Sequence, residues 1–259
     1  MVKFLVVLIL SILNFSCVTS PDSERRQFIV VPNWKVQELG LQAYQEILQS
    51  EPLSKDQRLI AEVEKIGQAI AAASGQDFPW EFKVLANDEM VNAFCLPGGK
   101  VGVYTGIIKV AENTAGLAAV IGHEVAHATL RHGAERMSQA LASQAGLTLA
   151  SISMADSKYR GAILAALGLG VQVGLTLPYS RLHEQEADEV GSKYMAKAGY
   201  DPREAIALWQ RMAQLSKSAS PEFLSTHPHP ASRVENLQKK MPELMPIYNS
   251  SQRQATRPL

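Results

Sequence analysis

A five-residue segment, His-Glu-Val-Ala-His at positions 123–127, constrains this chain more than any other feature. Its surroundings, from Ala115 to His132, have the apolar spacing of a helix. On a helix, residues four positions apart lie on the same face, so His123 and His127 can bind one metal ion together. Glu124 then lies beside the metal, where its carboxylate can take a proton from a bound water. The segment therefore predicts a metal site that performs hydrolysis.

A catalytic zinc site needs a third protein ligand, and the spacings of two known hydrolase types are absent here. A metzincin requires Gly and His at the places where this chain has Leu130 and Gly133. A thermolysin-like site would take a carboxylate soon after the motif, but no acidic residue lies between Glu135 and Asp156. The third ligand must therefore come from further along the chain.

The next acidic cluster, residues 180–189, reads as a second helix, on which Glu184 and Asp188 share one face. Such a pair fits a metal ligand together with a carboxylate that accepts a hydrogen bond from the far nitrogen of a ligating histidine. The same charges also fit a solvated helix face, which is the more common role of such runs. Spacing alone does not choose between these interpretations, nor between Glu184 and Glu186 as the ligand.

Several further motifs, in a characteristic order, carry a resemblance. They are Asn92-Ala93-Phe94, Leu96-Pro97-Gly98-Gly99, Ser180-Arg181-x-x-Glu184-x-x-Ala187-Asp188 and Thr226-His227-Pro228, with the 123–127 segment between them. From about residue 34 to 240 the chain resembles the zinc endopeptidase family that includes the CAAX prenyl proteases, HtpX and the periplasmic protease BepA. The resemblance implies that His123, His127 and Glu184 bind one Zn²⁺ ion per chain. It also implies that Glu124 is the catalytic base.

The same resemblance places a histidine of the Thr-His-Pro motif near the metal. It therefore nominates His227, either as a removable plug on the zinc ion or as a helper that stabilises the oxyanion of the transition state. Arg181 could steady a carboxylate of the site or the tetrahedral intermediate, or simply pair with a neighbouring acid. Arg233, in the following helix, is expected to anchor the loop that carries His227.

The rest of the chain predicts an α+β fold, a mainly helical, zincin-like metalloprotease domain with a small antiparallel sheet. Helical apolar spacing covers Trp34–Gln49 and Asp56–Ala73, and strand-forming residues cover Trp80–Ala86 and Val91–Tyr104. An edge strand beside the metal can bind an extended peptide through backbone hydrogen bonds. Asn92-Ala93-Phe94 is the candidate for that strand, and an ordinary hairpin that covers the core is the alternative.

The N-terminus predicts export. Lys3 precedes an apolar run, Phe4–Leu13, which has the length of a signal peptide core and is too short to span a membrane. Ser16-Cys17 follows, so residues 1–16 are expected to be a lipoprotein signal, with lipid on Cys17 and residues 17–33 as a tether. The alternative is ordinary secretion with a free N-terminus. The lipoprotein interpretation places the protein in the periplasm, anchored to the outer membrane of a Gram-negative bacterium.

The remaining length, residues 34–249, is expected to form one catalytic domain, followed by a flexible tail at 250–259. With 46% apolar residues and 25 residues of each charge sign, the chain can bury a core and has no bias towards nucleic acid. Gly161–Leu177 is almost free of charge, but its four glycines and Gln172 favour helix packing over a membrane hairpin. Cys95 is expected to pack rather than react.

These features together predict a zinc-dependent metalloendopeptidase of the cell envelope that cleaves misfolded or misassembled envelope proteins. Its expected partners are polypeptide substrates, the membrane through the lipid anchor, and the outer-membrane assembly machinery. The alternative is a zinc-bound chaperone or assembly factor for outer-membrane proteins with little proteolysis. A purely structural zinc domain is disfavoured, because a closed site has no use for a base such as Glu124.

Overall fold

The computed structural model describes residues 17–20, 23, 25–153, 177–216, 227 and 230–259. Its strands are β1 (Cys17–Thr19), β2 (Arg26–Phe28), β3 (Glu81–Leu85), β4 (Ala93–Leu96) and β5 (Lys100–Tyr104). Its helices are α2 (Asn33–Ser50), α3 (Gln57–Ser74), α4 (Thr105–Ala111), α5 (Thr114–Thr129), α6 (His132–Ser153), α8 (Leu177–Lys197), α9 (Arg203–Leu215) and α11 (Pro230–Ser250). The predicted α+β, mainly helical fold is confirmed. The expected signal and most of the apolar segment at 161–177 lie outside the described residues.

The central sheet is mixed, in the order β3-β5-β4. β4 and β5 form an antiparallel hairpin, whose turn contains Gly98 and Gly99 with φ of +88° and +78°. β3 pairs in parallel with β5 instead. The prediction of an antiparallel sheet was therefore wrong for β3. The connection after β3 places β4 on the far side of β5, so that β5 separates the two earlier strands and β4 forms an edge of the sheet.

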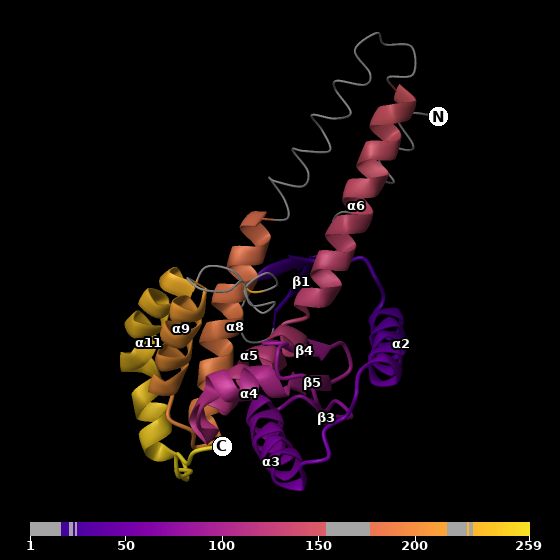
Figure 1. Cartoon of the computed structure of the whole chain (residues 1–259). Helices are drawn as coiled ribbons and strands as arrows, with labels where there is room; N and C mark the ends of the chain where they lie inside the picture. Colours follow the sequence, from indigo (N-terminus) through magenta and orange to yellow (C-terminus); the bar gives the residue numbers. More distant parts are fainter. Residues whose placement is uncertain (1–16, 21–22, 24, 154–176, 217–226, 228–229) are drawn as a thin grey trace.

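Helix α5, which carries the 123–127 motif, is buried along almost its whole length. Its N-terminus is capped by Asn113, whose side chain accepts a hydrogen bond from the backbone N–H of Gly116 at 2.8 Å. Its apolar residues point in all directions, as expected for a helix enclosed by other elements. Helix α5 contacts α8, α3, α9 and β4, and Figure 1 shows α9 and α11 on the outer side of α8.

Two glycines bring α5 and α8 into backbone contact. A Cβ atom added at Gly122 would lie 2.8 Å from the carbonyl oxygen of Gly191, and one added at Gly191 would lie 2.6 Å from the carbonyl oxygen of Gly122. Larger side chains would force the helices apart. Because Gly122 immediately precedes His123, this close approach brings the first histidine of the motif against the acidic face of α8.

Both ends of the described chain pack against the domain. β1 and β2 pair antiparallel, and the segment after them packs its apolar side chains against α2 and α6. At the other end, the backbone N–H of Thr114 donates to the carbonyl of Arg257 at 2.9 Å, and that of Leu259 donates to Glu112 at 3.2 Å. Residues 250–259, expected to be a flexible tail, are thus held by backbone hydrogen bonds at the start of α5. Among the described helices, none is long and apolar enough to cross a bilayer.

Candidate metal centre

Three buried side chains converge where α5 meets α8. The Nε2 atoms of His123 and His127 lie 3.0 Å apart. The carboxylate oxygens of Glu184 lie 3.4 Å from Nε2 of His123 and 3.3 Å from Nε2 of His127. Ligands about 2.0–2.1 Å from a tetrahedral zinc ion are separated by about 3.3 Å from one another. The three groups therefore stand at the separations that a shared metal ion requires, and their N and O donors suit zinc.

His227 completes a group of four. Its ligand atom and those of His123, His127 and Glu184 all lie within 4.8 Å of one another. The three imidazole rings meet edge to face, with the centroid of His227 5.0 Å from that of His123 and 5.3 Å from that of His127. Burial lowers the pKa of His227 to about 3, so its imidazole is neutral and keeps a lone pair for a metal. His227 can therefore reach the same ion as the other three residues.

Glu124 lies next to this group and is itself buried. Its Oε1 atom has no hydrogen-bond partner among the described residues, although Nε2 of His227 approaches it to 3.4 Å. Burial raises the pKa of Glu124 to about 7, while a backbone N–H of Cys95 on β4 opposes the rise. A buried carboxylate with a vacant oxygen is a proton acceptor poised for neutral pH, which is what a hydrolytic metal site needs.

A carboxylate and a guanidinium lie behind the first histidine. Asp188 approaches Nδ1 of His123 at 3.1 Å. Arg233 of α11 donates from Nε to Oδ2 of Asp188 at 2.6 Å and from Nη1 to Oε2 of Glu184 at 2.8 Å. Its guanidinium also lies 3.4 Å from the ring centroid of Trp209. Burial would raise the pKa of Asp188, but Arg233 outweighs it and holds that pKa below its usual range.

The two arginines considered from the sequence differ in position. Arg181 is exposed on α8, whereas Arg233 is buried. In the described part of the chain, the guanidinium that contacts Glu184 and Asp188 is that of Arg233. The sequence predicted only a loop-anchoring role for Arg233, because its partners Asp188 and Glu184 lie 45 and 49 positions away from it along the chain. The one available signal was that Arg233 follows the Thr-His-Pro motif closely.

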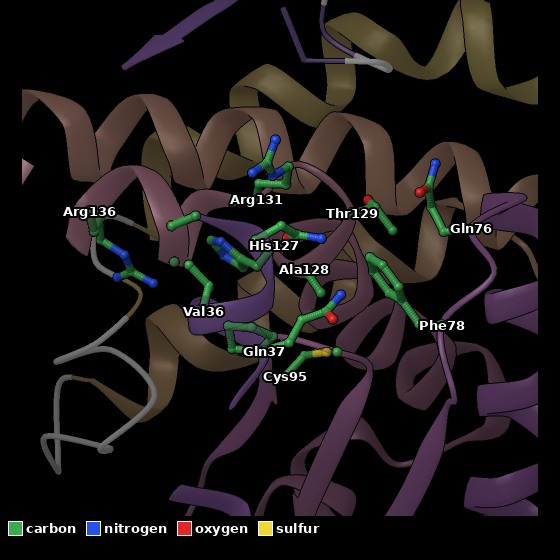
Figure 2. A pocket seen from close by; sticks show the side chains of 15 residues that line it. Val36, Gln37, Gln76, Phe78, Cys95, His127, Ala128, Thr129, Arg131 and Arg136 are labelled. Atoms are coloured by element: carbon green, nitrogen blue, oxygen red, sulfur yellow. The ribbon is translucent and has the colours of Figure 1, made fainter. Parts of the chain in front are cut away.

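A pocket opens beside this group, between α2, the end of β4 and the junction of α5 with α6. Its volume is about 250 Å³, and its walls include His127, Cys95 and Phe78, together with Arg131 and Arg136 (Figure 2). Asn92, Ala93 and Phe94 lie at the start of β4 or just before it, on the edge strand of the sheet. Burial raises the pKa of the Cys95 thiol well above its usual range, so Cys95 is protonated and not a nucleophile.

The chain matches known metallopeptidases over most of its length. A family model for peptidase family M48 matches residues 54–241. The chain is 34% identical to the mitochondrial metalloendopeptidase OMA1 of Saccharomyces cerevisiae over 254 residues, which is 90% of this chain and 71% of that protein. It is 30% identical to the beta-barrel assembly-enhancing protease of Escherichia coli over 211 residues, which is 78% of this chain and 43% of that protein. The chain thus spans less than half of the bacterial relative.

Proposed function

The chain belongs to peptidase family M48 and is a metalloendopeptidase, and from this premise we propose that it is a zinc enzyme of the cell envelope that cleaves misfolded or misassembled envelope proteins. The observation that carries this proposal is the buried convergence of His123, His127 and Glu184 beside Glu124. A structural zinc site would have no need of a buried base with a vacant oxygen.

We assign His123, His127 and Glu184 as the zinc ligands. When bound there, zinc would lower the pKa of a water molecule to about 7 and polarise the scissile carbonyl. Glu124 takes the proton of the attacking water at its free Oε1 and later delivers it to the departing amine. With a metal on Nε2 of His123, the neutral ring would carry its proton on Nδ1, and Asp188, 3.1 Å away, would accept that hydrogen bond and orient the ring. No acyl-enzyme forms in this scheme.

The substrate is proposed to lie along the edge of the sheet. An extended peptide can add to β4 as a further strand beside Asn92, Ala93 and Phe94. This mode of binding tolerates many peptide sequences, because backbone groups make the hydrogen bonds. β4 also packs against α5, and the backbone of Cys95 on β4 lowers the pKa of Glu124. A side chain of the peptide would enter the pocket beside His127, where Arg131 and Arg136 favour acidic or polar groups.

The cellular setting is proposed from the relatives and the N-terminus. One relative is named a beta-barrel assembly-enhancing protease, which supports a role with the outer-membrane assembly machinery. Residues 1–16 would be removed as a lipoprotein signal, and Cys17 would carry the lipid that anchors residues 34–249 to the periplasmic face of the outer membrane. The second candidate function is a zinc-bound chaperone or assembly factor with little proteolysis.

The test is the Glu124→Gln variant of the purified protein. It should lose hydrolysis of an unfolded protein substrate such as reduced casein and retain one zinc ion per chain, because Glu124 moves protons and does not bind the metal. The matched control is Glu89→Gln, which alters an exposed glutamate and should leave both properties unchanged. Hydrolysis by Glu124→Gln at the wild-type rate would refute the assignment. In cells, a Glu124→Gln protein that still fulfils the wild-type role would favour the chaperone.

A further inference from the structure

The two nitrogens of His127 face different partners. Nε2 points towards Nε2 of His123, 3.0 Å away, and towards Glu184. Nδ1 points to the opposite side, where it lies 2.9 Å from Nδ1 of His132. His132 is the first residue of α6 and is completely buried. The proposed metal ligand is therefore contacted from behind by a second histidine that the metal site does not use.

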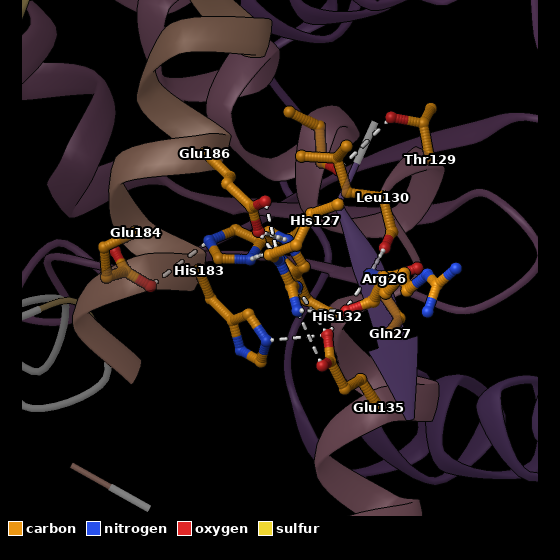
Figure 3. A network of polar contacts seen from close by, with 12 residues as sticks. Arg26, Gln27, His127, Thr129, Leu130, His132, Glu135, His183, Glu184 and Glu186 are labelled. Atoms are coloured by element: carbon orange, nitrogen blue, oxygen red, sulfur yellow. Dashed lines mark hydrogen bonds and ion pairs between the residues drawn. The ribbon is translucent and has the colours of Figure 1, made fainter. Parts of the chain in front are cut away.

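The contact between these two ring nitrogens determines which nitrogen of each imidazole would carry the proton when a metal is bound. A metal ion on Nε2 of His127 occupies the lone pair of that nitrogen, so the neutral ring carries its proton on Nδ1. Nδ1–H must then donate to Nδ1 of His132, because a contact between two ring nitrogens needs one donor and one acceptor. His132 in turn carries its proton on Nε2. That nitrogen lies 3.1 Å from Oε2 of Glu186, which accepts the bond. Figure 3 shows this chain of residues.

The N-terminal strand pair, β1 and β2, completes the chain of contacts. Arg25, just before β2, donates to Glu186 from Nε at 2.8 Å and from Nη2 at 3.1 Å. The same guanidinium donates to both oxygens of Glu135 at 2.8 and 2.6 Å. Gln27 of β2 donates to the carbonyl of Leu130 at 2.6 Å, which satisfies an oxygen at the C-terminus of α5. The strand pair thus binds the turn between α5 and α6 on both sides of His132.

We propose that His132 is a positioning residue for the metal ligand His127, and that Arg25, which directly precedes β2, holds this arrangement in place through Glu186. The inference rests on the proposed zinc function. Residues that hold the far nitrogen of a ligating histidine orient the ring and raise the basicity of the ligand. His127 would be held in this way by a histidine, as His123 is by Asp188. The segment expected to be a tether is then part of the metal site.

A matched pair of amide variants tests His132. The amide of asparagine occupies the place of Nδ1 of a histidine and keeps an acceptor for His127, whereas the amide of glutamine reaches the place of Nε2 and keeps only the contact with Glu186. His132→Asn should therefore bind Zn²⁺ more tightly than His132→Gln in a chelator competition titration, although more weakly than wild type, because it loses the contact with Glu186. His132→Gln should bind it about 10- to 100-fold more weakly than wild type. The visible spectrum of the Co²⁺-loaded protein reports the metal ligands directly. It should therefore change more for His132→Gln than for His132→Asn.

Two arginine neighbours test the role of Arg25. Arg25→Gln should weaken Zn²⁺ binding and shift the Co²⁺ spectrum, whereas Arg26→Gln changes an exposed residue and should do neither. Equal Zn²⁺ affinities for His132→Asn and His132→Gln would overturn the role of His132, and equal affinities for Arg25→Gln and Arg26→Gln would overturn the role of Arg25. Wild-type protein that binds no Zn²⁺ would instead refute the proposed function itself, so the failures are distinguishable.

Discussion

Nη1 of Arg233 donates to Oε2 of Glu184 at 2.8 Å, so the carboxylate that is proposed to bind the metal also binds a buried guanidinium. The same guanidinium binds Asp188 through Nε. One arginine thus contacts two buried carboxylates. This arrangement offsets part of the cost of burying the acidic face of α8 against α5, since unpaired buried charges would be very costly.

The first prediction concerns this arginine. Arg233→Met should lower the free energy of unfolding of the metal-free protein by about 3–5 kcal/mol, because it removes the buried cation that both carboxylates contact. The loss should be smaller in the zinc-loaded protein, where the metal supplies positive charge. Urea denaturation with and without zinc measures both values. As a control, Arg203→Gln removes an exposed ion pair with Asp201 and should change stability by no more than about 0.5 kcal/mol. An equal loss with and without zinc would contradict this explanation.

The second prediction separates the carboxylates of α8. Glu184→Gln should weaken zinc binding most, because it removes a ligand, and Asp188→Asn should weaken it by about 10- to 100-fold through His123. Glu189→Gln is the control, since Glu189 pairs with Lys240 at 2.6 Å away from the metal. Chelator competition on the three variants measures the order. If Glu184→Gln binds zinc as tightly as Glu189→Gln does, Glu184 is not a ligand.

How much of the site the sequence could predict depends on how far apart the interacting residues lie along the chain. His123 and His127 lie one helical turn apart, so a local rule places both on one face of α5. Glu184 needed the resemblance, because spacing could not separate it from Glu186. The contacts of His132 and Arg233 depend on how α6, α8 and α11 pack on α5, and no local pattern records that packing.

For the fold too, the sequence predicted the features that local patterns determine and missed those that depend on long-range packing. The helices around Trp34–Gln49 and Asp56–Ala73 followed from apolar periodicity and appear as α2 and α3. The pairing of β3 with β5 did not, because a strand pattern predicts a strand without its partner or direction. Arg25 in the expected tether was equally invisible, since its partners Glu135 and Glu186 lie 110 and 161 positions away.

The third prediction concerns the N-terminus. Lipid on Cys17 would place the anchor at the first residue of β1, which pairs with Phe28 of β2. Mass spectrometry of the N-terminal peptide should find a diacylated or triacylated Cys17, and the protein should fractionate with membranes. Cys17→Ser should be soluble, whereas Cys95→Ser, the matched control, should remain with the membranes. An unmodified Cys17, or an N-terminus elsewhere, would refute the lipoprotein assignment.

The last prediction concerns His227. Its ligand atom lies within 4.8 Å of those of His123, His127 and Glu184, and its neutral imidazole can take the fourth position on the metal. A histidine there would exclude the catalytic water, so the resting enzyme would be latent. His227→Ala should then keep its zinc and cleave reduced casein faster than wild type. The double variant Glu124→Gln/His227→Ala should be inactive, because the gained activity uses the same base. If His227 instead stabilises the oxyanion, His227→Ala should lower the rate by about 10²–10³-fold with its zinc retained. Steady-state rates of the single variant decide between a plug and a helper, and an unchanged rate would exclude both.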